Sequence, residues 1–223
     1  MHYIAKSKVD ASLPTKSVSA AKWCLPVFLG AATLLQSQTA SAAVVYSGIL
    51  NHPVPVTNQG TVVNLITGVV QNGPASDVPG WDINPYGTAT NNVALLASAS
   101  TGIMRNPDVG TSTFRTNLAL GTVVAPSAFF YGNSAAVIGT SVGQWLANSE
   151  GYFGLKFINE STGATHYGFM ALRIGANATD RTIVGFAYET TAGTAIIVTP
   201  IIPAPAAGLI ALGAGFGARR RRR

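Results

Sequence analysis

A Gly-x-Ser-x-Gly motif at residues 139–143 is the first stretch whose residue types could perform covalent chemistry. In hydrolases that use this motif, a sharp turn exposes the serine, and an acid and then a histidine must follow along the chain. Here the only later histidine is His166, and the only later aspartate, Asp180, comes after it. Glu150 and Glu160 precede His166 but belong to a segment that is predicted to form a hairpin. We therefore expect a glycine turn at 139–143 and no catalytic residue.

Paired carboxylates are the second kind of chemistry to look for, because two of them cleave glycosidic bonds when they lie about 5 to 10 Å apart. Neighbouring positions of a strand provide such pairs. Glu150, Glu160 and Glu189 have no acidic residue two or four positions further on, and Glu160 is better explained as a turn residue. The sequence favours a non-enzymatic protein, with a glycan-active enzyme of lectin fold as the weakest alternative.

Metal ligands are sparse along the chain. His52 and His166 are isolated, and no Cys or His cluster has the spacing of a metal site. Asp77, Asp82 and Asn84 supply the oxygen atoms that calcium prefers, although the stretch around Asp82 also fits an Asx-type turn. We expect no metal and no cofactor, with a structural calcium ion at these three residues as the alternative.

Aromatic side chains beside loop glycines and asparagines are suited to stack on sugar rings. Trp81, Tyr86 and Trp145 have such neighbours and are the candidate glycan-binding residues. The alternative is that Trp81 and Trp145 close the ends of a hydrophobic core, which the usual burial of tryptophan favours.

The elements that would position these residues are β-strands. Residues 43–199 alternate short apolar stretches with Gly, Pro and Asn turns, and no helical period is sustained. Residues 151–174 predict a hairpin that turns at 160–163, where Gly163 suits a positive φ. In its first arm, one face carries Phe153, Leu155 and Phe157, and the other face carries Tyr152, Gly154 and Lys156. In its second arm, one face carries Met170, Leu172 and Ile174, and the other face carries Tyr167, Phe169 and Arg173.

A third strand is predicted directly after this hairpin, with Val184, Phe186 and Tyr188 on one face. Three adjacent amphipathic strands indicate a sheet with one packed face, which the remaining short strands would cover. The expected fold is all-β, a two-sheet antiparallel β-sandwich of jelly-roll or lectin-like type. A signal helix and a short hydrophobic helix would flank it.

The first 42 residues have the three parts of a secretory signal. Lysines come first, eleven apolar residues follow at 25–35, and Ala40-Ser41-Ala42 provides the small residues that signal peptidase requires. Eleven residues of helix cover about 16 Å, which is short of a bilayer core of about 30 Å. We therefore expect signal peptidase to cleave after Ala42.

Residues 200–223 form a second signal at the other end. Pro203-Ala204-Pro205 precedes thirteen small or apolar residues at 206–218, about 20 Å of helix and again short of a full span. Five arginines end the chain: Arg219, Arg220, Arg221, Arg222 and Arg223. They would remain on the cytoplasmic side of the inner membrane, so the segment is expected to act as a stop-transfer signal and a weak, transient anchor.

The net charge of +6 would by itself suggest a nucleic-acid partner. The positive charges are confined to the two ends, however. Residues 43–218 carry five Lys or Arg against seven Asp or Glu, a net charge of −2. The body has no excess of basic residues, and we expect no nucleic acid partner.

The ending resembles the PEP-CTERM sorting signal of Gram-negative bacteria, in a Pro-Ala-Pro variant with Ala204 in place of the usual glutamate. The body, through "VVYSG", "VNLITG", "GWDINPYG", "GYFGLKFINESTGATHYGFMAL" and "FAYETTAGTAI", is similar to an extracellular domain that recurs ahead of such signals. The resemblance implies recognition by exosortase, a membrane protease.

The sequence thus predicts three parts: a signal peptide at 1–42, a β-sandwich domain at 43–199 and a sorting signal at 200–223. The expected protein is exported, held briefly in the membrane and then placed at the cell surface or outside the cell. Signal peptidase and an exosortase-like protease are its expected partners, and exopolysaccharide or biofilm matrix its expected surroundings. The alternative is a carbohydrate-binding module that uses exposed aromatic residues.

Overall fold

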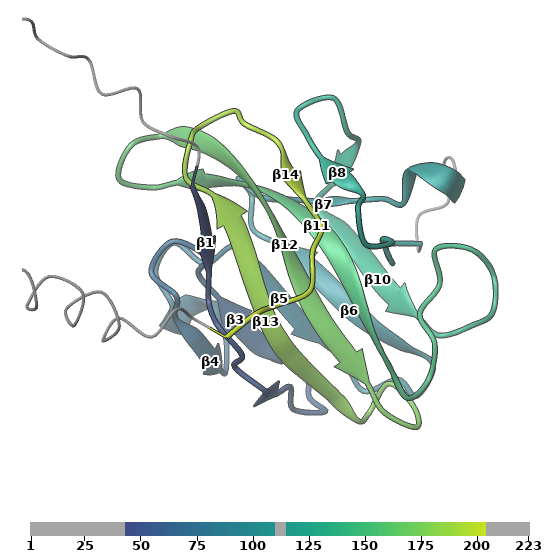
Figure 1. Cartoon of the computed structure of the whole chain (residues 1–223). Coiled ribbons are helices and arrows are strands. Elements are labelled where there is room, and N and C mark those ends of the chain that lie inside the picture. Colours follow the sequence, from purple (N-terminus) through teal and green to yellow (C-terminus); the bar gives the residue numbers. More distant parts are fainter. Residues whose placement is uncertain (1–42, 110–114, 204–223) are drawn as a thin grey trace, which may run out of the picture. The chain divides into compact units, whose positions relative to one another are not determined.

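Three long antiparallel strands run side by side through the structure (Figure 1). They are β11 (Ser149–Asn159), β12 (Ala164–Ile174) and β13 (Arg181–Glu189). The computed structural model describes residues 43–109 and 115–203. β11 and β12 pair in register along their whole length, with Phe153 opposite Met170. The hairpin predicted for residues 151–174 is confirmed.

The turn of this hairpin is built from backbone and side-chain hydrogen bonds to Asn159. The Asn159 carbonyl accepts hydrogen bonds from the N–H groups of Thr162 at 3.2 Å and Gly163 at 2.8 Å. The side-chain oxygen of Asn159 accepts a hydrogen bond from the Ser161 N–H. Gly163 has φ +70°, a left-handed conformation that glycine adopts at little cost. The positive φ predicted for Gly163 is confirmed.

Short strands extend the long ones into a seven-stranded antiparallel sheet. Its order is β1-β13-β12-β11-β7-β9, and β2 pairs with the start of β13. The added strands are β1 (Val44–Tyr46), β2 (His52–Pro53), β7 (Gly102–Met104) and β9 (Phe130–Tyr131).

A five-stranded antiparallel sheet has the order β10-β6-β5-β3-β4, and β14 pairs with β8. The strands are β3 (Thr61–Val63), β4 (Val70–Asn72), β5 (Ile83–Tyr86), β6 (Asn92–Ala97), β8 (Val123–Val124), β10 (Asn133–Val137) and β14 (Ile196–Ile197).

Helical structure in the described residues is limited to two three-residue 3-10 turns, η1 (Ala75–Asp77) and η2 (Pro107–Val109). The all-β class is confirmed. Neither of these turns is long or apolar enough to cross a membrane. The signal helix predicted in residues 1–42 and the hydrophobic helix predicted at 206–218 lie outside the described residues.

Both sheets contribute to one buried cluster of side chains. Phe153 and Met170 of the larger sheet share it with Ile83 and Leu95 of the five-stranded sheet. Burying a side chain of this size contributes about 1.5 to 3 kcal/mol relative to leaving it exposed. The alternation of side chains along β11 and β12 is therefore stabilised by contact with the smaller sheet.

The opposite face of the larger sheet is also buried, contrary to the prediction of one packed face. Tyr152 and Phe169 belong to a second cluster that includes Val124 of β8, Ile196 of β14 and the nearby Val198. Large aromatic residues on both faces of β11 and β12 explain the difference, because each face presents enough apolar surface to need a cover.

The prediction that Val184 shares a face of the sheet with Phe186 and Tyr188 is wrong. The pairing of β12 with β13 shifts at this point: Ala171 is opposite Gly185 and Leu172 is opposite Ile183. Val184 is the extra residue of a β-bulge, which reverses the alternation of side chains beyond it. Val184 consequently lies in the second cluster, whereas Phe186 lies in the first.

Arg181 joins three loops through its buried guanidinium, which is 2% exposed. It donates hydrogen bonds to the carbonyls of Ala178 at 3.2 Å, Pro55 at 2.6 Å and Gly87 at 2.5 Å. Burial lowers the pKa of the guanidinium, but an arginine retains its charge at any ordinary pH. The start of β13 is thus tied to two distant segments by a buried cation.

Replacing Arg181 with lysine should destabilise the domain by about 3 kcal/mol. An ammonium group cannot reach all three carbonyls at once, so buried acceptors would be left without a hydrogen bond. Urea unfolding measures the loss. Arg173→Lys, at an arginine whose side chain is 51% exposed, is the matched control and should change stability by less than about 0.5 kcal/mol. Equal stability of the two variants would contradict this role for Arg181.

Candidate binding site

An open pocket of about 500 Å³ lies beside β7 and β9 at the edge of the larger sheet. Three segments line it: residues 104–107 at the end of β7 and beyond it; Val123, Ala125, Ser127 and Ala128 in and after β8; and the aromatic residues Phe129 and Tyr131. Pockets that bind small molecules combine apolar walls with a few polar groups, and this lining has both kinds of residue.

Aromatic rings and one cation dominate the pocket. The guanidinium carbon of Arg105 lies 3.1 Å from the centroid of the Tyr131 ring, a cation–π contact that covers one face of that ring. Phe129 is 78% exposed and is the ring that a ligand would reach first. Asn106 is engaged internally, because its amide donates to the Asn117 carbonyl and accepts the Asp108 N–H.

Strand alternation explains this arrangement of rings. Phe130 pairs with Met104 across β9 and β7 and packs against the second cluster. Its neighbours Phe129 and Tyr131 therefore belong to the opposite face. This site was not predicted from the sequence, although the run Phe129-Phe130-Tyr131 carries its signal: consecutive aromatic residues in extended chain cannot all face one core.

Trp145 is a core residue, and its prediction as a glycan-binding residue is corrected. Its side chain is 0% exposed, its indole N–H donates to the Thr116 hydroxyl at 3.1 Å, and its ring lies 6.3 Å from that of Phe153. A Cβ at Gly151 would lie 2.6 Å from the indole, so glycine is needed for this close approach. The alternative, a tryptophan that fills the core, is the one observed.

Trp81 and Tyr86 are both partly exposed. Tyr86 is the last residue of β5, whereas Trp81 lies outside that strand, and Trp145 lies in the core. The structure therefore does not bring the three predicted glycan-binding residues together. A role for Trp81 or Tyr86 stays a prediction.

The Gly-x-Ser-x-Gly motif forms the predicted glycine turn. Gly143 has φ +76°, and the Ser141 N–H donates to the Gln144 side chain at 2.9 Å. His166 is buried elsewhere, with Nδ1 hydrogen-bonded to the Glu189 carbonyl at 2.9 Å and its ring stacked on Phe157. Serine and histidine have separate partners and do not form a catalytic pair.

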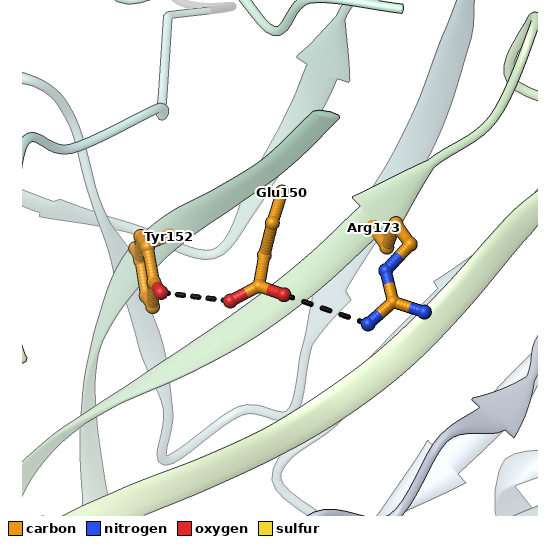
Figure 2. Close-up of polar contacts among 3 residues, drawn as sticks. All are labelled: Glu150, Tyr152 and Arg173. Atoms are coloured by element: carbon orange, nitrogen blue, oxygen red, sulfur yellow. Dashed lines mark hydrogen bonds and ion pairs between the residues drawn. The ribbon is translucent and has the colours of Figure 1, made fainter. Parts of the chain in front are cut away.

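The candidate carboxylates Glu150 and Glu160 lie at opposite ends of β11, about 33 Å apart at 3.3 Å per residue. Glu150 accepts the Tyr152 hydroxyl at 2.7 Å and pairs with Arg173 at 3.7 Å, as Figure 2 shows. Burial, followed by the Glu150 carboxylate, raises the pKa of Tyr152. The tyrosine remains a protonated donor, so the hydrogen bond and the ion pair orient these three side chains on the sheet.

Asp82 is a fully buried carboxyl group. One oxygen accepts the Leu65 N–H at 2.8 Å and the other accepts the Thr101 hydroxyl at 3.2 Å. Burial, together with a smaller effect of the nearby Glu160 carboxylate, raises the pKa of Asp82 to about 7 against the lowering effect of the two hydrogen bonds. Glu160 at the hairpin tip therefore lies near a carboxyl group 78 residues away in sequence, a proximity that spacing could not reveal.

The three residues considered for calcium have different partners. Asp77 is exposed in η1 beside Ser76, Asp82 bonds to Leu65 and Thr101, and the Asn84 amide donates to the Gln59 carbonyl at 2.8 Å. Within residues 43–109 and 115–203, no group of three or more His, Cys, Asp or Glu side chains is placed to hold a metal ion. A calcium ion at Asp77, Asp82 and Asn84 stays an alternative prediction.

The wild type should lose stability relative to Asp82→Asn as pH rises from about 4 to about 7. The pKa of Asp82 is about 7 in the folded state against an ordinary 3.8, so the folded chain holds a proton that the unfolded chain releases in this window. Urea unfolding at five pH values measures the difference. Asp77→Asn, at an exposed carboxylate, is the control, and a difference between wild type and Asp82→Asn that does not vary with pH would contradict the prediction.

The pocket of Arg105, Phe129 and Tyr131 is thus a part of the described surface that is suited to hold a ligand, whereas the titratable residues singled out in the sequence are dispersed. Comparison with models of protein families, with curated proteins and with solved structures gives no match. The function must be inferred from the residues of this chain.

Proposed function

We propose that the chain is a non-enzymatic, exported β-sandwich protein that an exosortase-type system delivers to the cell envelope or the extracellular matrix. One observation carries the proposal: the folded domain fits between the two predicted signals. β1 begins at Val44, two residues after the predicted cleavage site at Ala42, and β14, the last strand in the described residues, ends at Ile197, ahead of the Pro-Ala-Pro motif at 203–205. A body bounded in this way can fold after export without either signal.

The core supports a domain that is stable outside the cell. Cys24 is the only cysteine and lies in the leader, so the body is held by burial and hydrogen bonds without a disulfide. The two larger sheets share one apolar cluster, which supports a two-sheet sandwich of jelly-roll or lectin-like type. Such a domain needs no disulfide-forming enzyme to fold.

A secreted reporter that carries residues 200–223 should enter the membrane fraction of a cell that expresses an exosortase, and should then appear as a shorter form at the surface or in the medium. The apolar segment and the arginines would retain the reporter, and the protease would release it. A tail with both Pro203→Ala and Pro205→Ala is the matched control and should remain unprocessed. A reporter with the intact tail that is found only as a soluble cytoplasmic protein, despite its leader, would contradict the proposal.

A second candidate function is the binding of an extracellular polysaccharide in the pocket beside β9. The exposed ring of Phe129 can stack on a sugar ring, and Arg105 can donate hydrogen bonds to its hydroxyl or carboxylate groups. This site takes the place of the one that the sequence analysis assigned to Trp145.

Phe129→Ala should weaken binding to exopolysaccharide from the producing cells about tenfold, because a stacked ring contributes about 1.4 kcal/mol. Calorimetric titration measures the affinity. Leu146→Ala removes a comparably exposed apolar side chain, 53% exposed and outside the pocket lining, and should leave binding unchanged. Equal affinity of wild type and Phe129→Ala would exclude this site.

A further inference from the structure

Glu189 is a buried carboxylate at the end of β13, with only 3% of its surface exposed. One of its oxygen atoms accepts two backbone N–H groups, from Thr191 at 2.8 Å and from Ala43 at 3.1 Å. Among the described residues, no Lys, Arg or His side chain forms an ion pair with it. Because a buried carboxylate is costly without an opposite charge, the absence of a side-chain cation here requires an explanation.

The nitrogen atom of Ala43 is held in place independently of Glu189. The Ala43 carbonyl accepts the Thr190 N–H at 2.9 Å, and the next residue, Val44, is opposite Glu189 in the ladder of β1 with β13. This nitrogen therefore faces the Glu189 carboxylate because of strand pairing. A change in the charge of the nitrogen would leave that geometry in place.

We propose that Glu189 is the binding site for the α-ammonium group that cleavage after Ala42 creates. In the uncleaved chain the Ala43 nitrogen is a neutral amide with one N–H. Hydrolysis consumes one water: its hydroxyl goes to the Ala42 carbonyl carbon, and the nitrogen takes a hydrogen and, at neutral pH, a further proton. The ammonium group so formed has an ordinary pKa of about 7.7 to 8.0 and lies within 3.1 Å of the carboxylate.

This inference rests on the proposed export, because signal peptidase supplies the cleavage. It also implies that cleavage strengthens the attachment of β1, which the sorting signals alone do not imply. β1 is an edge strand of three residues whose Val44 and Val45 are each 40% exposed. A partly buried ion pair at Ala43, the residue before β1, anchors this strand more firmly in the cleaved chain than in the uncleaved chain.

The test uses the full chain exported with its own leader. N-terminal sequencing should find Ala43 first. An amine-specific reagent at pH 7 then compares the α-amine with Lys156, the one lysine that remains between residues 43 and 223. The α-amine should react about tenfold more slowly in the wild type than in Glu189→Gln. Lys156 should react equally in both, and Glu150→Gln, at an exposed carboxylate of the same sheet, should match the wild type.

A second variant keeps Glu189 and its surroundings unchanged, in case Glu189→Gln does not fold. A valine inserted between Ala42 and Ala43 moves the new amine outward by about 3.3 Å, and this amine should react as fast as that of an unfolded chain. If the wild type is cleaved after Ala42 and its amine reacts equally fast, the ion pair is excluded while export stands. A leader that is not cleaved would overturn both proposals.

Discussion

The in-register pairing of β11 with β12 is the constraint on which the rest of the structure depends. It fixes which side chains lie on each face of the larger sheet, so that Phe153 meets the five-stranded sheet while Tyr152 meets the residues around β8 and β14. It also places the two ends of the hairpin: Glu150 beside Arg173 at one end and Glu160 near Asp82 at the other. The dispersion of the carboxylates follows directly from the length of these strands.

Buried charged groups mark the places where distant segments meet this central hairpin and β13. Arg181 holds carbonyls from two loops at the start of β13, and Glu189 holds the nitrogen of Ala43 at its end. Each group costs free energy to bury and is compensated by backbone partners. Their geometry therefore specifies how the segments around β1 and β2 lie along the larger sheet, which apolar contacts alone would fix less uniquely.

The sequence predicted what local patterns determine and missed what long-range contacts determine. Alternation and a turn glycine sufficed for the hairpin and for the all-β class. The bulge at Val184 was not predictable, because it depends on a mismatch with the partner strand. The partners of Arg181 lie 126 and 94 residues away, and the pocket at Phe129 depends on which of three adjacent aromatic residues the core accepts. For Trp145, the usual burial of tryptophan was a better guide than its glycine and asparagine neighbours, which are typical of a loop.

We propose that the exported chain loses both ends around a β domain that folds on its own contacts. Intact-mass analysis of the protein recovered from the surface or medium of cells that express an exosortase measures this directly. The mass should correspond to a chain that begins at Ala43 and lacks the arginines at 219–223. Recovery of the protein only from the cytoplasm, with residues 1–42 still attached, would contradict it.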